Sequence, residues 1–307
     1  MLLILNNLLP IFAIIGLGIF LKRRKWIGDS FISSTDRLIY YIFFPALLFW
    51  KIGKPTNGAG IESGLILAVF VTVFIIFLIS LLLTRLFRMS DYDVGSFTQG
   101  CYRFSSYIGL ALTFTALGDE GGRTFGVLIG FIIPFINVLV VSSMTWFSGE
   151  ISSKRSKTSM VLKSVVSNPL IIACLAGIIY ARLAIPFPVF VDNTLALMSS
   201  ITLPLALVSI GGTLNFSGNR KHLWKAFLAS IVKLVMMPVI GYLCIKYFGV
   251  SNTGLQVAMI YFALPTSPQN YILSSQLNSD VDLATLTIVV STFLSILSLS
   301  VILILFV

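Results

Sequence analysis

The stretch LLILNNLLPIFAIIGLGIFLKRRK, residues 2–25, decides the fold class of this chain. Its apolar part runs from Leu2 to Leu21, close to the roughly twenty residues that a helix needs to cross about 30 Å of hydrocarbon. Four basic residues follow it, whereas a secretory signal places its positive residues before the apolar core. We therefore interpret the run as a retained first span whose N-terminus lies outside.

The composition extends this conclusion to the whole chain. Of the 307 residues, 57% are hydrophobic and only 10% are charged, whereas a soluble domain carries roughly a quarter charged residues. The apolar runs do not alternate as the strands of a membrane barrel would, so helices are the spanning elements. The sequence predicts an all-α integral membrane protein.

The apolar runs predict ten transmembrane helices, which fall into two groups of five. The chain then divides into a first five-helix repeat (1–147), a basic cytoplasmic linker (148–160) and a second five-helix repeat (161–307), all within one membrane domain. The predicted spans are 2–21, 37–53, 64–87, 94–117, 124–147, 161–182, 192–214, 226–248, 253–276 and 283–306.

The basic residues support this layout. Most of them, including the clusters Lys22–Lys25 and Lys154–Lys157, fall in loops that the layout places in the cytoplasm, as the positive-inside rule requires. The net charge of +10 is thus interpreted as a determinant of topology and not as a nucleic-acid-binding surface. We expect a multi-pass protein of the plasma (inner) membrane, with both termini outside and the central loop inside.

An internal repeat is indicated by residues that align without a gap. A shift of 159 residues brings Pro10 onto Pro169 and Pro45 onto Pro204, with similar apolar contexts around each pair. Five spans are an odd number, so a second copy must enter the membrane from the opposite face. Inverted repeats are common in secondary transporters, whose substrate site lies at the repeat interface near the midplane.

Span nine contains FALPTSPQNYIL, residues 262–273. Pro265 and Pro268 lack an N–H, so they predict a break of about one turn. The polar residues around this break should face protein or a wet cavity, because lipid cannot satisfy the freed backbone groups. The alternative is a simple proline kink satisfied by its neighbours. The candidate site residues here are Pro265, Thr266, Ser267, Pro268, Gln269 and Asn270.

Span four contains GSFTQGCYRFSSYIGLAL, residues 95–112, and is the matching segment of the first repeat. Arg103 lies about midway along it, at a depth where an arginine costs about 3 kcal/mol. No acidic residue lies near the middle of any predicted span. Arg103 therefore either receives an anionic substrate, or snorkels toward the interface or donates to backbone carbonyls of the broken turns. Ser105, Ser106 and Gly109 complete the candidate site.

Other polar residues within spans have simpler interpretations. Lys233 lies about two turns from the cytoplasmic Lys225, which favours a side chain that snorkels toward the interface. Asn137 is either a pore-lining amide or the donor of a lone interhelical hydrogen bond. The three cysteines lie in apolar segments and predict packing residues, not a disulfide framework.

Several chemistries find no support in the sequence. His222 is the only histidine and lies in a predicted loop, so no zinc-peptidase helix is available. Because no catalytic constellation is present, we expect neither an enzyme nor a metal site or cofactor. A coupling ion, H⁺ or Na⁺, is left open, and so is a homodimer.

The order of these segments resembles the bacterial branch of the auxin efflux carrier family over nearly the whole chain. The segments are LPIFAIIGLGIFLKRRKWI, LIYYIFFPALLF, YRFSSYIGLAL, the basic central loop, NPLIIACLAGIIY, LPLALVSIGGTL and ALPTSPQNYIL. The resemblance implies an inverted five-plus-five repeat with a scaffold bundle and a transport bundle. It also implies that helices four and nine are broken and cross at the substrate site, as in the bile-acid sodium symporter-like fold, and that an elevator-like shift gives alternating access.

Plant members of that family export auxin, and the resemblance to the bacterial branch implies small organic anions such as dicarboxylates. The chain has Ser105 and Ser106 where relatives usually have an asparagine near the crossing, and it lacks the crossing proline and the long loop of plant members. The sequence therefore predicts a secondary transporter for a small carboxylate. The alternatives are a sodium-coupled symporter of the bile-acid type and, from another class, a membrane sensor.

Overall fold

The computed structural model describes residues 2–54, 62–147, 168–183, 185–214, 220–276 and 278–307, and every regular element in these ranges is a helix. The predicted linker 148–160 and the beginning of predicted span six lie outside them. The fold class predicted from the composition is thus confirmed as all-helical.

The first half of the chain forms helices of ten residues or more, and a short π-helix joins the second of them to the third without a gap. Its elements are α1 (Leu2–Arg23), α2 (Asp29–Leu38), the π-helix η1 (Ile39–Phe43), α3 (Phe44–Gly53), α4 (Ser63–Leu86), α5 (Asp91–Tyr102) and α6 (Ser106–Phe147). Only Gly118 interrupts α6, with φ 68° and ψ −159°.

The second half is also built from helices, one of which contains a second π-helix. Its elements are α8 (Pro169–Arg182), α9 (Val189–Thr213), the 3₁₀ turn η2 (Arg220–His222), α10 (Leu223–Ile231), the π-helix η3 (Val232–Met236), α11 (Met237–Tyr247), α12 (Asn252–Ala263), α13 (Gln269–Gln276) and α14 (Val281–Phe306).

Six helical stretches in the described ranges are long and apolar enough to cross a membrane. They are Asn6–Arg23, Ser63–Leu86, Asp91–Met144, Val189–Thr213, Leu223–Tyr247 and Val281–Phe306. Asp91–Met144 contains predicted spans four and five together, because the helix resumes directly after Gly118. A single glycine in the left-handed φ region, where other residues are strained, turns the chain between these two predicted spans.

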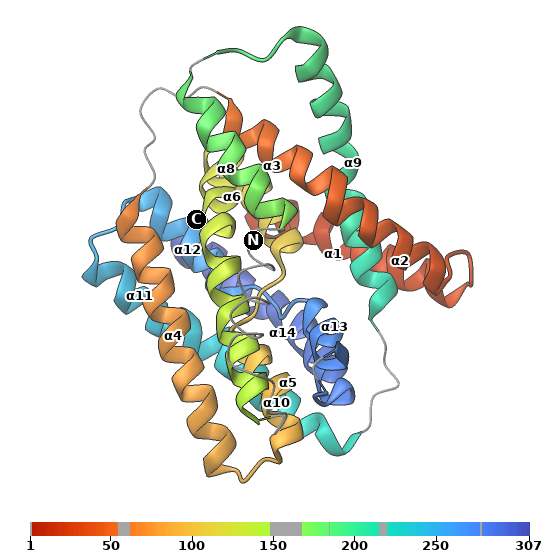
Figure 1. Cartoon of the computed structure of the whole chain (residues 1–307), viewed down its shortest axis with the longest axis vertical. Coiled ribbons are helices and arrows are strands. Elements are labelled where there is room, and N and C mark those ends of the chain that lie inside the picture. The colour runs from red at the N-terminus through yellow and green to blue at the C-terminus, as the bar shows by residue number, and fades with distance from the viewer. Residues whose placement is uncertain (1, 55–61, 148–167, 184, 215–219, 277) are drawn as a thin grey trace.

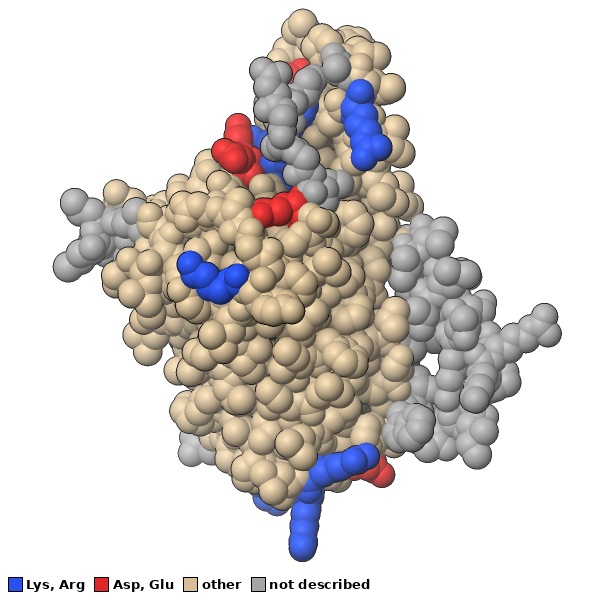
Figure 2. All heavy atoms as spheres, turned by 90° about the vertical axis from the view of Figure 1, so that its left-hand side faces the viewer, with Lys and Arg blue, Asp and Glu red and all other residues tan. Residues whose placement is uncertain are grey.

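The helices form two groups (Figure 1). Helices α1, α2, α3, α8 and α9 lie together, and α4, α5 and α10 to α14 form the other group, with α6 in contact with both. The outer surface carries many exposed apolar side chains, such as Leu82, Val189 and Leu197. Figure 2 shows a wide uncharged band between the charged side chains in its upper part and those at its lower end. A lipid-facing belt has this pattern.

Two prolines explain the two π-helices. Pro45 follows η1 by two residues and Pro238 follows η3 by two residues, so each π turn lies where the missing proline N–H leaves a carbonyl without its helical donor. For Pro238 this carbonyl belongs to Leu234, and it accepts a hydrogen bond of 2.9 Å from the Ser298 hydroxyl of α14. The wide turn is thereby satisfied inside the helix group.

Glycines set the closest approach between helices in the other group. A Cβ atom added at Gly18 of α1 would lie 2.2 Å from the Val208 carbonyl oxygen, and one added at Gly211 of α9 would lie 2.0 Å from that of Ile15. No side chain fits between these backbones. Small residues at crossing points allow such approach where no hydrophobic effect drives helices together.

Candidate functional site where two broken helices meet

The first break separates α5 from α6. A capping box of Ser90 and Asp93 begins α5, which ends at Tyr102 after twelve residues. Arg103 follows with extended backbone (φ −71°, ψ 148°), and α6 begins at Ser106. No proline causes this break, so the polar centre of the segment was the only sequence signal for it. The prediction that span four is interrupted is confirmed.

The second break separates α12 from α13. The Ser251 hydroxyl accepts from Gly254 N and begins α12, which also has twelve residues. Leu264 then takes extended backbone (φ −67°, ψ 146°), as expected of a residue before a proline. The chain becomes helical again at Gln269. The two prolines therefore open about one turn, as their spacing predicts.

Hydrogen bonds join the two breaks directly. Ser105 N donates to the Pro265 carbonyl at 2.9 Å, and the Thr266 hydroxyl donates to the Gly100 carbonyl at 2.9 Å. The Asn270 side-chain amide donates to the Ser96 carbonyl at 3.2 Å. Backbone groups that the breaks free are thus satisfied by the opposite break, which is what burial in a membrane domain requires.

Arg103 is buried at this meeting point, with 5% of its surface exposed. Its guanidinium donates to the side-chain oxygens of Gln99 at 3.0 Å, Asn137 at 3.3 Å and Gln269 at 2.7 Å. These acceptors come from α5, α6 and α13, and all three are neutral amides. In the described part of the chain no carboxylate pairs with Arg103, so its positive charge is oriented but not neutralised.

A small cavity lies beside this guanidinium. It is lined by Arg103, Phe104, Ser106, Ile133, Ile136, Asn137 and Gln269. Ser106 and Gln269 are the first residues of α6 and α13, so two helix N-termini border the cavity. Helix N-termini carry partial positive charge, and together with an arginine they favour an anion. Phe104 and the isoleucines give the cavity apolar walls.

The predicted site residues divide into two groups. Arg103, Ser106 and Gln269 line the cavity, whereas the others hold the crossing together. Thr266 and Asn270 bond to backbone carbonyls of α5, the Ser267 hydroxyl accepts from Gln269 N at 3.3 Å, and Pro265 contributes its carbonyl. Pro268 gives its carbonyl to Tyr271 N, and the Ser105 hydroxyl is buried without a partner in the described residues. Gly109 packs against Phe125 and Leu264.

Other residues at the cavity had weaker sequence signals. Asn137, weighed above as a lone interhelical hydrogen bond, accepts from Arg103 and lines the cavity. Gln99 was not predicted, although it lies four residues before Arg103 and so shares its helix face. The apolar wall formed by Ile133 and Ile136 cannot be distinguished by sequence from ordinary packing.

Lys233 corrects one prediction. Its side chain does not snorkel to the interface but is fully buried, with Nζ 3.0 Å from the Met237 sulfur and 5.2 Å from the centre of the Tyr261 ring. The physical reason lies in η3, since the helix around Lys233 packs against α5, α12 and α14. This position has protein on its sides where the prediction assumed an open path to water.

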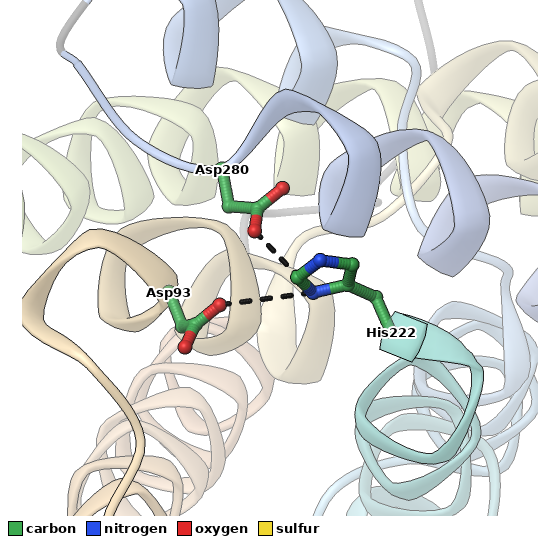
Figure 3. Close-up of side chains that lie close together, drawn as sticks. All are labelled: Asp93, His222 and Asp280. Carbon is green, nitrogen blue, oxygen red and sulfur yellow. Dashed lines mark ion pairs between the residues drawn. The ribbon is translucent and has the colours of Figure 1, made fainter. Parts of the chain in front are cut away.

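A second polar cluster lies at the ends of three helices (Figure 3). His222 Nδ1 lies 3.3 Å from Asp280 Oδ2 and 3.8 Å from Asp93 Oδ1. Asp280 also caps α14 through Leu283 N, and Asp93 accepts from Lys225 at 2.8 Å. One imidazole nitrogen and two carboxylates within 4.8 Å could hold a cation. Capping and the lysine already account for these carboxylates, so we assign the cluster to fastening α5, α10 and α14.

The comparisons with known proteins agree with this architecture. The chain matches the model of the "Membrane transport protein" family twice, over residues 3–155 and 150–303. It is 23% identical over 295 residues to a Rhizobium meliloti protein provisionally named a malonate transporter, covering 94% of this chain and 91% of that protein. It is also 24% identical to an uncharacterized transporter of Methanothermobacter thermautotrophicus and 23% identical to the uncharacterized transporter YfdV of Escherichia coli, covering at least 92% of each partner.

The fold and the matches together define the class: this is a multi-pass membrane protein of a transport family. The chain belongs to the membrane transport protein family, which is the auxin efflux carrier family that its segments resemble.

Proposed function

We propose that the chain is a secondary transporter that carries a small organic anion, a carboxylate, across the membrane. The observation that carries the proposal is the state of Arg103, which is buried between two broken helices and whose guanidinium binds amide oxygens, without a carboxylate partner among the described residues. Keeping an arginine at membrane depth costs about 3 kcal/mol. An anionic substrate is the partner that offsets this cost, because a carboxylate matches the fork of a guanidinium.

The lining of the cavity, and not its size in this structure, favours a small anion with an apolar part. Arg103 and the N-termini of α6 and α13 supply the positive potential, while Phe104 and the isoleucines contact carbon. The provisional name of the Rhizobium meliloti relative points in the same direction, toward a dicarboxylate such as malonate. In this proposal Ser106, Asn137 and Gln269 orient the substrate.

The proposed architecture is ten transmembrane helices in an inverted five-plus-five repeat. The family model matches two successive segments of the chain. Helices α5 and α12 have the same length, and each is followed by a residue with extended backbone. Both termini would lie outside, with the basic linker in the cytoplasm. The group of α1, α2, α3, α8 and α9 would act as the scaffold. The other group, together with α6, would move past it as an elevator and carry the crossing from one side to the other.

Transport by the purified protein in proteoliposomes tests the proposal. Uptake or exchange of mono-, di- and tricarboxylates is compared with that of neutral and cationic compounds, with and without sodium. We expect transport of one class of carboxylate. Transport of none of the acids would contradict the proposal, and strict dependence on sodium would favour a symporter of the bile-acid type.

The Arg103→Gln variant tests the role of the guanidinium. A hydrogen bond to a charged group contributes about 1.5–3 kcal/mol, so the apparent affinity for the carboxylate is expected to fall roughly tenfold or more. Arg182→Gln is the matched control, since Arg182 is exposed at the end of α8. Equal affinity in both variants would remove Arg103 from the site.

A further inference from the structure

Lys233 is a cation that the proposed anion site does not use. It is fully buried in the π turn of α10–α11. In the described part of the chain it forms no ion pair and donates to no oxygen, and its hydrogen bond goes to the Met237 sulfur, a weak acceptor. An ammonium ion without an anion or oxygen partner is costly at membrane depth. The surroundings thus favour the neutral amine, a base that can take up a proton.

The other titratable and charged groups that could act on Lys233 belong to the elements packed against it. The elements packed against η3 are α4, α5, α10, α11, α12 and α14. Cys101 of α5 interacts with it electrostatically, and Tyr261 of α12 places its ring under the amine. The remaining titratable or charged residues of these elements and of the break after α5 are Arg85, Asp91, Tyr92, Asp93, Tyr102, Arg103, Lys225, Tyr242, Cys244, Lys246, Tyr247 and Asp282. Within the described residues, none of these carboxylates forms an ion pair with Lys233.

One aromatic layer connects Lys233 to the substrate cavity. Its amine lies 5.2 Å from the Tyr261 ring, and the Tyr261 ring packs edge-on against Phe104 with centroids 4.5 Å apart. Phe104 lies in the break between α5 and α6 and lines the cavity beside Arg103. A charge that enters the cavity therefore acts on Lys233 across two buried aromatic rings, where electrostatic forces are less screened than in water.

We propose that Lys233 is the proton-carrying residue of the transporter, so that the anion moves together with a proton; the inference rests on the proposed function. With the cavity empty, the amine of Lys233 stays neutral, because its contacts in the described residues offer no anion or oxygen acceptor that would balance an ammonium ion. A bound carboxylate adds a negative charge to the cavity and favours uptake of one proton from bulk water on the side to which the carrier is open, which converts the amine to an ammonium ion. No other bond is made or broken.

This arrangement couples the two ligands by linkage. If the anion favours protonation of Lys233, protonation must favour the anion by the same factor. The loaded carrier then holds the anion and the extra proton together, and the empty carrier returns with neither. Arg103 cannot take the role of Lys233, because a guanidinium stays charged throughout the physiological range.

The variant Lys233→Met tests the inference, since methionine fills a similar volume beside Met237 without an ionisable group. Two quantities are measured in sodium-free proteoliposomes with malonate, or with the acid that the panel identifies. One is exchange of labelled for unlabelled acid at equal pH, and the other is accumulation driven by an imposed pH gradient, with a pH-sensitive dye in the lumen. Lys246→Met is the control, because Lys246 is an exposed lysine of the same helical stretch.

In the wild type and in Lys246→Met we expect exchange, accumulation along the pH gradient and proton movement with the substrate. In Lys233→Met we expect exchange to persist, while gradient-driven accumulation and substrate-linked proton movement fall to the level of protein-free vesicles. Retained coupling in Lys233→Met, or exchange without any coupling in the wild type, would overturn the role of Lys233 and leave the proposed function standing. Absence of exchange for every acid in the wild type would overturn both.

A second measurement covers the case in which Lys233→Met does not fold. The wild-type protein in weakly buffered detergent solution is mixed with the transported acid, and the proton uptake is recorded with an indicator dye. We expect proton uptake that saturates with the acid and is absent in Lys233→Arg, whose side chain stays charged. Binding of the acid without proton uptake by the wild type would contradict the inference.

Discussion

Gln269 and Arg103 form the shortest of the hydrogen bonds that orient the guanidinium, at 2.7 Å. Gln269→Glu replaces the amide acceptor with a carboxylate of nearly the same shape. It would neutralise Arg103 from within the protein and compete with any anionic substrate for the fork. We expect carboxylate transport to be lost although the variant forms a stronger bond to Arg103.

Gln269→Met separates this electrostatic effect from the loss of the amide. It removes one acceptor but adds no charge, so we expect weaker binding and measurable transport. The two variants are compared by the concentration dependence of uptake at neutral pH. Glutamate and methionine variants with the same transport rate would show that the charge of Arg103 is not used by the substrate.

The sequence predicted which residues meet at the site, but not which of them line the cavity and which hold the crossing together. Arg103 was identified because a charge at membrane depth costs free energy unless a partner or water offsets it. That argument uses only one position in the chain. Whether Thr266 faces the cavity or binds the Gly100 carbonyl depends on a second helix, so sequence cannot decide it. The error at Lys233 has the same origin: distance along its own helix suggested an interface, while packing by three other helices buries it.

At the scale of the helical elements, α1 and α9 depend on two glycines for their approach. Gly211→Ala would place a methyl carbon 2.0 Å from the Ile15 carbonyl oxygen, so the helices must separate. Overpacking of this kind typically costs about 1–3 kcal/mol. We expect a lower unfolding temperature in detergent for Gly211→Ala and for Gly18→Ala.

Gly16 provides the matched control on the same helix. A Cβ atom added there meets nothing within 4 Å, and alanine is a better helix former than glycine. Gly16→Ala should leave the unfolding temperature unchanged or raise it. Equal destabilisation by Gly16→Ala and Gly18→Ala would mean that helix propensity and not interhelical contact sets the effect.

The break that contains prolines was more predictable than the turn at Gly118. Pro265 and Pro268 predict their break by covalent structure alone. Gly118 lies between predicted spans four and five, but the sequence does not show that a single residue makes the turn. Asp119 and Arg123, which follow it, are helical; Asp119 pairs with Lys51 at 2.6 Å and Arg123 donates to the carbonyls of Lys51 and Lys54. These contacts fasten the start of the helix after Gly118 to the end of α3.

At the scale of the whole molecule, the elevator proposal requires the two helix groups to move relative to each other. Gly130 of α6 faces Cys174 of α8, with 2.9 Å between an added Cβ and the Cβ of Cys174. The distance between the Cβ atoms of a disulfide is about 3.8 Å, so a small shift would allow a Gly130→Cys bridge. Oxidation of this variant, with Cys101 and Cys244 replaced by alanine, is expected to stop transport, and a reductant is expected to restore it.

The single-cysteine protein that keeps only Cys174 is the control for oxidation itself. Cross-linking is followed by proteolysis between the two positions and by the mobility of the fragments. Full transport by the cross-linked protein would show that α6 and α8 do not separate during the cycle. Helix α6 would then belong to the scaffold and not to the moving group.

The hydrogen bond between Arg103 and Gln269 joins residues 166 positions apart, and this separation has a consequence for synthesis on the ribosome. When Arg103 enters the membrane, neither Gln269 nor the Pro265 carbonyl that receives Ser105 N has yet been made. The nascent chain must therefore keep its first broken helix in contact with water, lipid headgroups or the insertion machinery until the last quarter of the protein arrives. Assembly of the crossing is then a late event, and chains released before Leu264 would hold Arg103 through Gln99 and Asn137, without its shortest hydrogen bond.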